Sequence, residues 1–123
     1  MSEYVKGPLL VEGETKRIYM VVDHSDLCII ESKNTITAND DPKLTKEFET
    51  KAWAANITTC NVFELLKKAG IPVVYQEQIS DTEFLAEECT MIPLEVVGRR
   101  YAMIGSSFLK RNPGVVITSH FSY

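Results

Sequence analysis

The stretch 8-PLLVEGETKRIYMVVDHSDLCIIESK-33 decides the fold class of this chain. Three apolar runs, rich in β-branched residues, are separated by the short polar links "GET" (13–15) and "DHS" (23–25). Such runs, broken by Gly, Asp and Ser, are typical of strands joined by tight turns. The stretch therefore predicts an antiparallel meander of three strands.

One long helix is expected to follow these strands. Asp41 and Pro42 suit a helix cap and a first helical residue, so we expect the helix to begin there. It is predicted to run to Lys68, because lysines favour the last helical turn and Gly70 favours the end of a helix.

Apolar residues recur along the predicted helix at spacings of three or four, which indicates one buried face. This face consists of Trp53, Ile57, Cys60 and Phe63, with Phe48, Ala52 and Leu66 on an adjoining stripe. We expect the three aromatic residues to lie in the core and Cys60 to behave as a small buried apolar residue.

The remainder of the chain returns to a strand pattern. Strands are predicted over 71–78, 82–88 and 91–101, and a helical turn over 106–111. The expected fold is a single α+β domain, in which an antiparallel sheet carries one main helix on one face.

The composition excludes several classes of partner. The formal net charge of the 123 residues is -4, which provides no general basic field for nucleic acid or an anionic membrane. No apolar run is long enough to span a bilayer. The three cysteines form no CxxC pair, and the two histidines stand alone, so we expect reduced thiols, a cytoplasmic location and no metal ligands.

The link "GETK" is the first local signal for a function. A glycine between two strands, followed by a lysine, can fold over nucleotide phosphates, with backbone N–H groups and Lys16 supplying positive potential. The alternative is a plain hairpin with a glycine turn and an exposed lysine. The spacing alone favours this plain hairpin.

A second signal is the pair of charges in the predicted strand 91–101. Alternation places Glu95 and Arg99 on the same face of that strand. An arginine held by a glutamate presents a planar fork that matches two oxygens of a phosphate or carboxylate. The alternative is a solvated edge strand with an ion pair worth less than about 1 kcal/mol. The chemistry of the residues leaves both interpretations open.

Five segments carry a resemblance to a known family. They are "LLVEGETKRIY" (9–19), "SKNTITAND" (32–40), "KKAGIPV" (67–73), "DTEFLAEECTMIPLEVVGRR" (81–100) and "GSSFLKRNPGV" (105–115). Together they resemble the N-terminal lobe of SAICAR synthetase, the phosphoribosylaminoimidazole-succinocarboxamide synthase of purine biosynthesis. The similarity is greatest to the animal type, which is fused to a phosphoribosylaminoimidazole carboxylase. The resemblance implies a kinase-like N-terminal lobe.

The resemblance also implies roles for individual residues. The "GETK" segment matches the family's phosphate loop, and "TMIP" matches its hinge, where backbone groups contact adenine. Positions matching the ribonucleotide site follow in the chain. The implied ATP-binding residues are Gly13, Lys16 and Met91, and the implied substrate-binding residues are Glu95, Arg99, Ser106, Ser107 and Lys110.

The family's chemistry supplies the expected cofactors and partners. The resemblance implies ATP, Mg2+, L-aspartate and carboxyaminoimidazole ribonucleotide, with release of ADP and phosphate. An acyl phosphate would form on the ribonucleotide carboxylate and be attacked by the aspartate amine. Such a reaction needs mainly alignment and charge stabilisation from the protein.

The sequence departs from the family pattern in three ways. Glu14 stands where the phosphate loop usually has a lysine, and like charge disfavours a phosphate there. The segment from Arg100 to Lys110 is longer than the pattern, so the substrate serine is either Ser106 or Ser107. The family's second lobe, with its "DFKLEFG"-like carboxylates, has no match, so we expect residues 1–123 to be a truncated N-terminal lobe.

Three functional hypotheses follow. In the first, the chain supplies the ATP- and ribonucleotide-binding lobe of the ligase, completed by a second lobe or in a homo-oligomer. In the second, it is a non-catalytic, nucleotide-binding or regulatory module that associates with the full-length enzyme. In the third, it is an inert product that merely folds.

Overall fold

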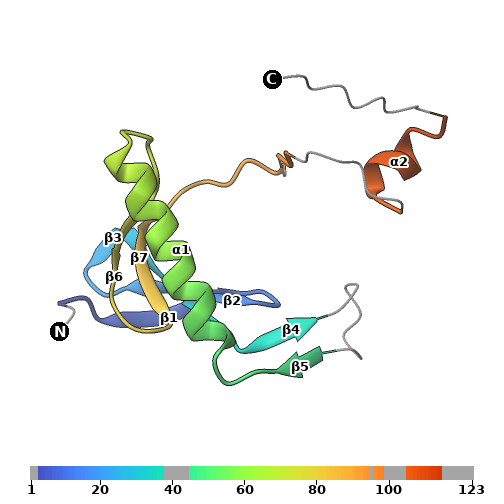
Figure 1. Ribbon diagram of the computed structural model, residues 1–123. Helices are drawn as coiled ribbons and strands as arrows, with labels where there is room; N and C mark the ends of the chain where they lie inside the picture. Colours follow the sequence, from blue (N-terminus) through green and yellow to red (C-terminus); the bar gives the residue numbers. More distant parts are fainter. Residues whose placement is uncertain (1–2, 38–44, 95, 99–104, 115–123) are drawn as a thin grey trace. The chain divides into compact units, whose positions relative to one another are not determined.

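A computed structural model describes residues 3–37, 45–94, 96–98 and 105–114 (Figure 1). The chain divides into two units, Met1–Thr90 and Met91–Tyr123. The first unit contains the sheet and the long helix, and the second contains one short helix within its described residues.

The first unit is built on a five-stranded antiparallel sheet with the order β1-β2-β3-β7-β6. Its strands are β1 (Lys6–Glu12), β2 (Lys16–Val21), β3 (His24–Ser32), β6 (Tyr75–Gln78) and β7 (Glu83–Glu87). The first three strands form the predicted meander, so this prediction is confirmed. The strands predicted over 71–78 and 82–88 are also present, although each is shorter than predicted.

A two-stranded ladder takes the place of the predicted start of the helix. Strands β4 (Thr35–Thr37) and β5 (Thr45–Glu47) pair with each other, and the N–H of Phe48 donates to the Asn34 carbonyl at 3.0 Å. The helix α1 therefore begins only at Lys51 and ends at Lys68. The prediction that it begins at Asp41-Pro42 is wrong, because residues 45–47 use their backbone groups in the ladder; Asp41 and Pro42 themselves lie outside the described residues.

Helix α1 packs on one face of the sheet, against β3, β6 and β7 (Figure 1). Its buried residues are Ala52, Asn56 and Cys60, and Phe63 packs beside them against Tyr75 and Phe84. The buried, small Cys60 confirms the prediction for that residue. The aromatic contacts fix the C-terminal half of the helix on the sheet.

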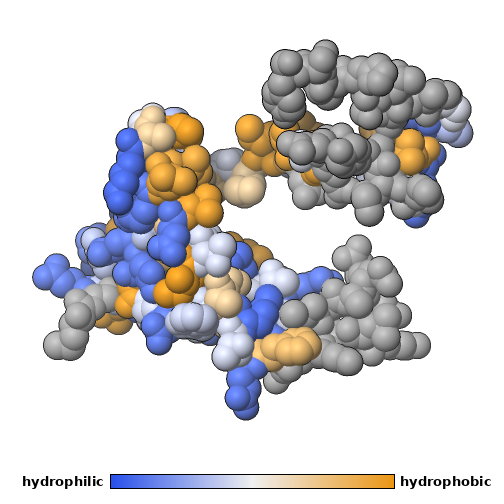
Figure 2. Space-filling view, in the orientation of Figure 1, coloured by the Kyte–Doolittle hydropathy of each residue, from blue (hydrophilic) through white to orange (hydrophobic). Residues whose placement is uncertain are grey.

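The predicted core positions Trp53 and Phe48 are wrong. Each side chain is 50% exposed. The buried stripe runs through Ala52, Asn56 and Cys60, and Trp53 lies one residue beyond it, about 100° further around the helix. Apolar spacing therefore misplaced the helix face, because the stripe includes a buried asparagine. Apolar surface also covers the C-terminal half of α1, where Val62 and Leu65 are exposed (Figure 2).

The opposite face of the sheet carries a second apolar cluster, built from Val21, Ile29 and Leu85. Tyr4, Tyr19, Leu27 and Ile79 pack around it. Strand alternation explains the two faces, because Cys28 and Ile30 point toward α1 whereas Leu27 and Ile29 point away. The sheet is thus covered by side chains on both faces.

Two asparagines tie α1 to the rest of the first unit. Asn56, which is fully buried, donates from Nδ2 to the carbonyls of Ser80 at 3.1 Å and Glu83 at 3.4 Å. Asn34 accepts the Ala52 N–H on Oδ1 at 2.9 Å. This bond satisfies one of the unpaired N–H groups at the start of the helix, where the Thr50 side chain makes no capping bond.

The second unit does not contain the predicted strand within its described residues. Residues 91–94 and 96–98 have no strand, and the Leu94 N–H donates to the Ile92 carbonyl at 2.7 Å across Pro93. A three-residue turn of this kind interrupts an extended strand, and Pro93 offers no N–H to a ladder. The predicted helical turn over 106–111 is confirmed as α2 (Ser107–Arg111). None of the described helices is both long and apolar enough for a membrane span.

The buried amide of Asn56 generates a prediction about stability. Replacing it by alanine removes the hydrogen bonds to Ser80, in the turn between β6 and β7, and to Glu83, at the start of β7, and leaves a cavity. We expect Asn56→Ala to lower the free energy of unfolding by about 1–3 kcal/mol, measured by urea denaturation. The exposed Thr58→Ala on the same helix is the control and should stay within about 0.5 kcal/mol of the original protein. Equal effects of the two substitutions would contradict the assignment.

The three cysteines should differ in reactivity. Cys28 and Cys60 are buried and free, and burial raises the pKa of each thiol, whereas Cys89 is exposed. Because thiolate is the reactive form, iodoacetamide at pH 8 should label Cys89 and leave the other two intact until the protein is unfolded. Peptide mass spectrometry measures this order. Labelling of Cys60 in the folded protein at the rate of Cys89 would disprove it.

Candidate nucleotide-binding site

The site begins at the link between β1 and β2. Residues 13–15 form a three-residue turn, closed by a hydrogen bond from the Gly13 N–H to the Lys16 carbonyl at 2.8 Å. Glu14 and Thr15 are exposed, and no hydrogen bond from the N–H of either residue is recorded within the described part of the chain. The turn therefore offers two backbone donors to an anion in solution.

Lys16 begins β2 and points to the face of the sheet that carries α1. Its ammonium donates to the Ser32 hydroxyl at 3.3 Å and lies 6.0 Å from the centre of the Phe84 ring. Burial lowers the pKa of the Lys16 ammonium, and the positive charge of Lys51 lowers it further. Of the alternative interpretation, the hairpin with its glycine turn is confirmed, whereas the exposed lysine is wrong, because the Lys16 side chain is half-buried.

Lys16 is distinguished from its neighbours by having no carboxylate partner among the residues that the structure describes. Lys6 bonds Glu31 and Glu83 on the other face of the sheet. Arg17 bonds Glu12, and Lys33 bonds the same carboxylate. A partly dehydrated cation without a counter-charge is a favourable place for an anionic ligand, because the ligand replaces both the missing charge and the missing water.

A network of ion pairs joins the residues that flank the turn. Glu12 Oε1 accepts from Lys33 Nζ at 2.8 Å and from Arg17 Nε at 3.0 Å. These two contacts, with that of Lys33 foremost, lower the pKa of the Glu12 carboxyl below its usual value. The network holds the last residue of β1 against the start of β2 and the segment after β3.

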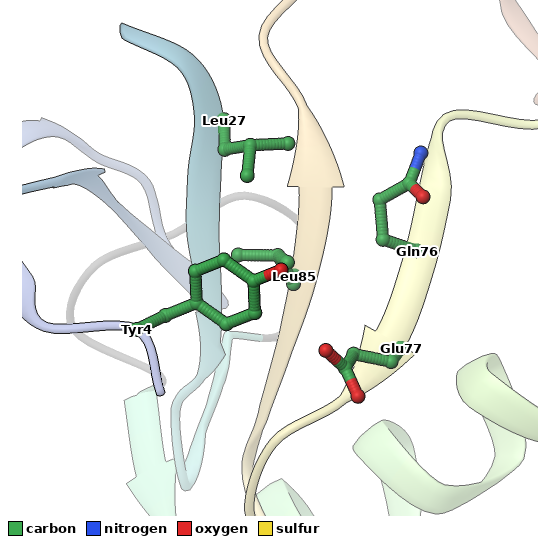
Figure 3. A pocket seen from close by; sticks show the side chains of 5 residues that line it. All are labelled: Tyr4, Leu27, Gln76, Glu77 and Leu85. Atoms are coloured by element: carbon green, nitrogen blue, oxygen red, sulfur yellow. The ribbon is translucent and has the colours of Figure 1, made fainter. Parts of the chain in front are cut away.

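A hollow of the first unit lies on the face of the sheet opposite Lys16. It has a volume of about 290 Å³ and is lined by Leu27, Leu85 and Tyr4, with Gln76 and Glu77 of β6 at its edge (Figure 3). Leu27 and Leu85 belong to the face of the sheet opposite α1, so this hollow does not include Lys16. The candidate site, turn 13–15 with Lys16, is therefore separate from this hollow.

The remaining predicted site residues belong to the second unit. Met91 is 82% exposed at the start of this unit. Ser106 caps α2, with its hydroxyl accepting the Leu109 N–H at 3.4 Å, while Ser107 is the first helical residue and Lys110 lies in the last turn. Glu95 and Arg99 lie outside the described residues. The structure therefore brings Gly13 and Lys16 together, and the substrate-binding predictions stay predictions.

The described residues contain no group of three or more His, Cys, Asp or Glu side chains that could hold a metal ion. The part of the chain that the structure describes therefore does not fit a protein-held Mg2+ site.

Sequence reasoning missed three residues that shape the site. Lys33 and Thr35 bond the turn, and Ser32 bonds Lys16. All three lie in "SKNTITAND" (32–40), a segment that resembles the family but for which the resemblance implied no binding residue. The available signal was their position at the end of a buried strand, where polar side chains need partners.

Taken together, the fold and the site define an α+β lobe with a glycine turn and a dehydrated lysine at one end of its sheet. Comparisons with known proteins identify the family. The model of the family described as SAICAR synthetase matches residues 9–122. The chain belongs to the SAICAR synthetase family.

Two curated relatives show the extent of the match. The "Probable multifunctional protein ADE2" of Caenorhabditis elegans is 48% identical over 107 residues, which cover 87% of this chain and 25% of the relative. The human bifunctional phosphoribosylaminoimidazole carboxylase/phosphoribosylaminoimidazole succinocarboxamide synthetase is 41% identical over 109 residues, covering 89% of this chain and 25% of the relative. The chain thus spans about a quarter of the length of these relatives.

Solved structures agree on the fold. A SAICAR synthetase (Type-2) in complex with ADP has a TM-score of 0.73 and 30% identity, over 86% of this chain and 43% of that one. The phosphoribosylaminoimidazole-succinocarboxamide synthase of Ehrlichia chaffeensis has a TM-score of 0.76 and 26% identity, over 94% of this chain and 47% of that one. The predicted fold class, an antiparallel sheet with one main helix, is confirmed.

The network behind the turn predicts a titration. The Glu12 carboxyl should titrate below 4.5, its usual value, because its charged form is bonded by Lys33 and Arg17. Its contribution to stability is therefore present above about pH 4.5 and is lost as the pH falls through the lowered pKa. Carbon-detected NMR of the side-chain carboxyl measures the midpoint. Lys33→Met should raise the midpoint more than Arg17→Met, and an unchanged midpoint in both variants would contradict the network.

Proposed function

We propose that this chain is the ATP- and ribonucleotide-binding lobe of a SAICAR synthase, working in the ligation of L-aspartate to carboxyaminoimidazole ribonucleotide in purine biosynthesis. The observation that carries the proposal is the half-buried Lys16 ammonium, which has no described carboxylate partner, beside a turn in which two N–H groups donate no hydrogen bond within the described residues. Family membership and the ADP in one similar structure support a nucleotide as the anion.

In this proposal the residues of the first unit bind and orient the triphosphate. Lys16 donates a charge-assisted hydrogen bond to a phosphate oxygen and exchanges its contact with the Ser32 hydroxyl for one with the ligand. The N–H groups of Glu14 and Thr15 donate to the same anion. ATP supplies the phosphoryl group that activates the ribonucleotide carboxylate.

The second unit would supply the remaining contacts. Backbone groups at Met91 would hold adenine, and Glu95, Arg99, the serine pair 106–107 and Lys110 would hold the ribonucleotide. The hydroxyl of Ser106 already accepts the Leu109 N–H as a helix cap, so Ser107 is the freer of the two serines for a substrate contact. Mg2+ would accompany ATP, with ligands outside the described residues.

The nucleotide half of the proposal is tested by calorimetry with ATP. Because a charge-assisted hydrogen bond contributes about 1.5–3 kcal/mol, Lys16→Met should weaken ATP binding about 10- to 100-fold. Lys68→Met is the matched control, since Lys68 is exposed at the far end of α1, and it should bind ATP as the original protein does. The absence of ATP binding by the original protein would overturn the proposal.

The proposed ligase activity is tested by adding the part of a relative that this chain does not match. The chain, mixed with the remaining part of a relative such as the human protein, should release ADP only when both L-aspartate and the ribonucleotide are present. A coupled assay for ADP measures this. Failure to form product with a mixture that binds ATP would remove the ligase assignment and leave nucleotide binding in place.

A second function is favoured by the exposed Glu14 carboxylate in the turn, because like charge there disfavours the alignment of a phosphate. The alternative is a module that binds nucleotide without turnover. Such a module would bind ATP and associate with the full-length enzyme. Co-sedimentation with a full-length relative, together with ATP binding and no ADP release, distinguishes it from the catalytic lobe.

A further inference from the structure

Every carbonyl of the turn 13–15 is held by the short segment that follows β3. The Gly13 carbonyl accepts from Lys33 Nζ at 3.1 Å. The Glu14 carbonyl accepts from the Thr35 hydroxyl at 2.6 Å, and the Thr15 carbonyl accepts from the Lys33 N–H at 2.8 Å. Two residues therefore provide all three donors.

The planar peptide bond turns these contacts into a directional constraint. In a trans peptide, the carbonyl of one residue and the N–H of the next point in opposite directions. Holding the Gly13 carbonyl toward Lys33 points the Glu14 N–H away from it, and holding the Glu14 carbonyl toward Thr35 points the Thr15 N–H away. These are the two N–H groups of the turn for which no hydrogen bond is recorded in the described chain.

The Lys33 side chain is itself fixed. It is 16% exposed, and its ammonium also bonds Glu12 at 2.8 Å. Glu12 in turn bonds Arg17, so the ammonium that holds the Gly13 carbonyl is anchored to a network and not free in water. A lysine held in this way acts on the backbone of the turn and is not available to a ligand.

We infer that Lys33 and Thr35 are positioning residues, which fix the carbonyls of turn 13–15 so that the N–H groups of Glu14 and Thr15 are aimed together at a phosphate group. The inference rests on the proposed function, because it names the residues that prepare the proposed phosphate contact. Because the turn is already ordered, a phosphate that binds the two N–H groups does not have to offset the conformational entropy cost of ordering it.

Loss of these contacts should weaken binding of the phosphate part of the ligand and leave binding of the rest unchanged. Without the contact from Lys33, the peptide between Gly13 and Glu14 is free to rotate, and the turn must be ordered when an anion binds. Adenine and ribose do not contact this turn in the proposal, so their binding should not change. ATP and adenosine therefore separate a positioning role from a general loss of structure.

The test compares the full chain with Lys33→Met and Thr35→Val. We expect each variant to bind ATP at least about fivefold more weakly, while binding of adenosine stays within about twofold. Lys33→Arg keeps the charge and should recover part of the ATP affinity. Lys68→Met is the matched control: it removes an exposed cation in the last turn of α1, away from turn 13–15 and its network, and ATP binding should be unchanged.

A second measurement reads the turn directly. In the original protein, tripolyphosphate should shift the amide resonances of Glu14 and Thr15 in a nitrogen–proton NMR spectrum, and adenosine should not. In Lys33→Met these shifts should require a several-fold higher concentration of tripolyphosphate, with the melting temperature recorded alongside as the measure of folding.

The outcomes distinguish the proposed function from the positioning role of Lys33 and Thr35. If the original protein binds neither ATP nor tripolyphosphate, the proposed function and this inference both fall. If it binds ATP and the folded Lys33→Met and Thr35→Val bind ATP equally well, the inference alone is overturned. If the two variants lose ATP and adenosine affinity in equal proportion, the role of both residues is structural, and the inference is again overturned.

Discussion

The end of β3 is the point on which the rest of the first unit depends. Three successive residues there each bond a different part of the molecule: Ser32 bonds Lys16, Lys33 bonds the glycine turn, and Asn34 bonds the start of α1. Ser32 is buried, so its hydroxyl needs a partner within the protein. One short segment therefore positions the lysine, the turn and the helix relative to one another.

This segment also bears on how an acidic chain would bind the proposed anion. The formal net charge is -4, but the acidic side chains that flank the turn are engaged: Glu12 with Lys33 and Arg17, and Glu31 with Lys6 and Arg17. Glu14, within the turn, is exposed to water. Lys16 is left without such a partner among the described residues, on the opposite face of the sheet from Glu31. Local pairing, and not net charge, sets the potential at the turn.

The sequence predicted the strands of the five-stranded sheet well because their signal is local. Alternating β-branched runs and short polar links specify a meander whatever lies around them. The helix was predicted less well: its end at Lys68 followed from local signals, but its start is set by the contact of Asn34 with Ala52, which no local pattern encodes. Likewise, the buried Asn56 interrupts the apolar stripe, so periodicity assigned Trp53 to the core. At the site, a glycine and a lysine were recognisable, whereas Lys33 and Thr35 act through the backbone of a turn some 20 residues away.

Under the proposed function, the position of Glu14 would let the turn bind a phosphate despite its departure from the family pattern. Its carbonyl is held by Thr35, but its side chain is exposed. An exposed carboxylate can rotate into water, where the high dielectric constant reduces its repulsion of a phosphate about 4 Å away to about 1 kcal/mol. The backbone N–H of the same residue keeps its direction, because that direction depends on the Gly13 carbonyl and not on the side chain. A lysine at this position would add attraction, but the donor that the turn provides does not require it.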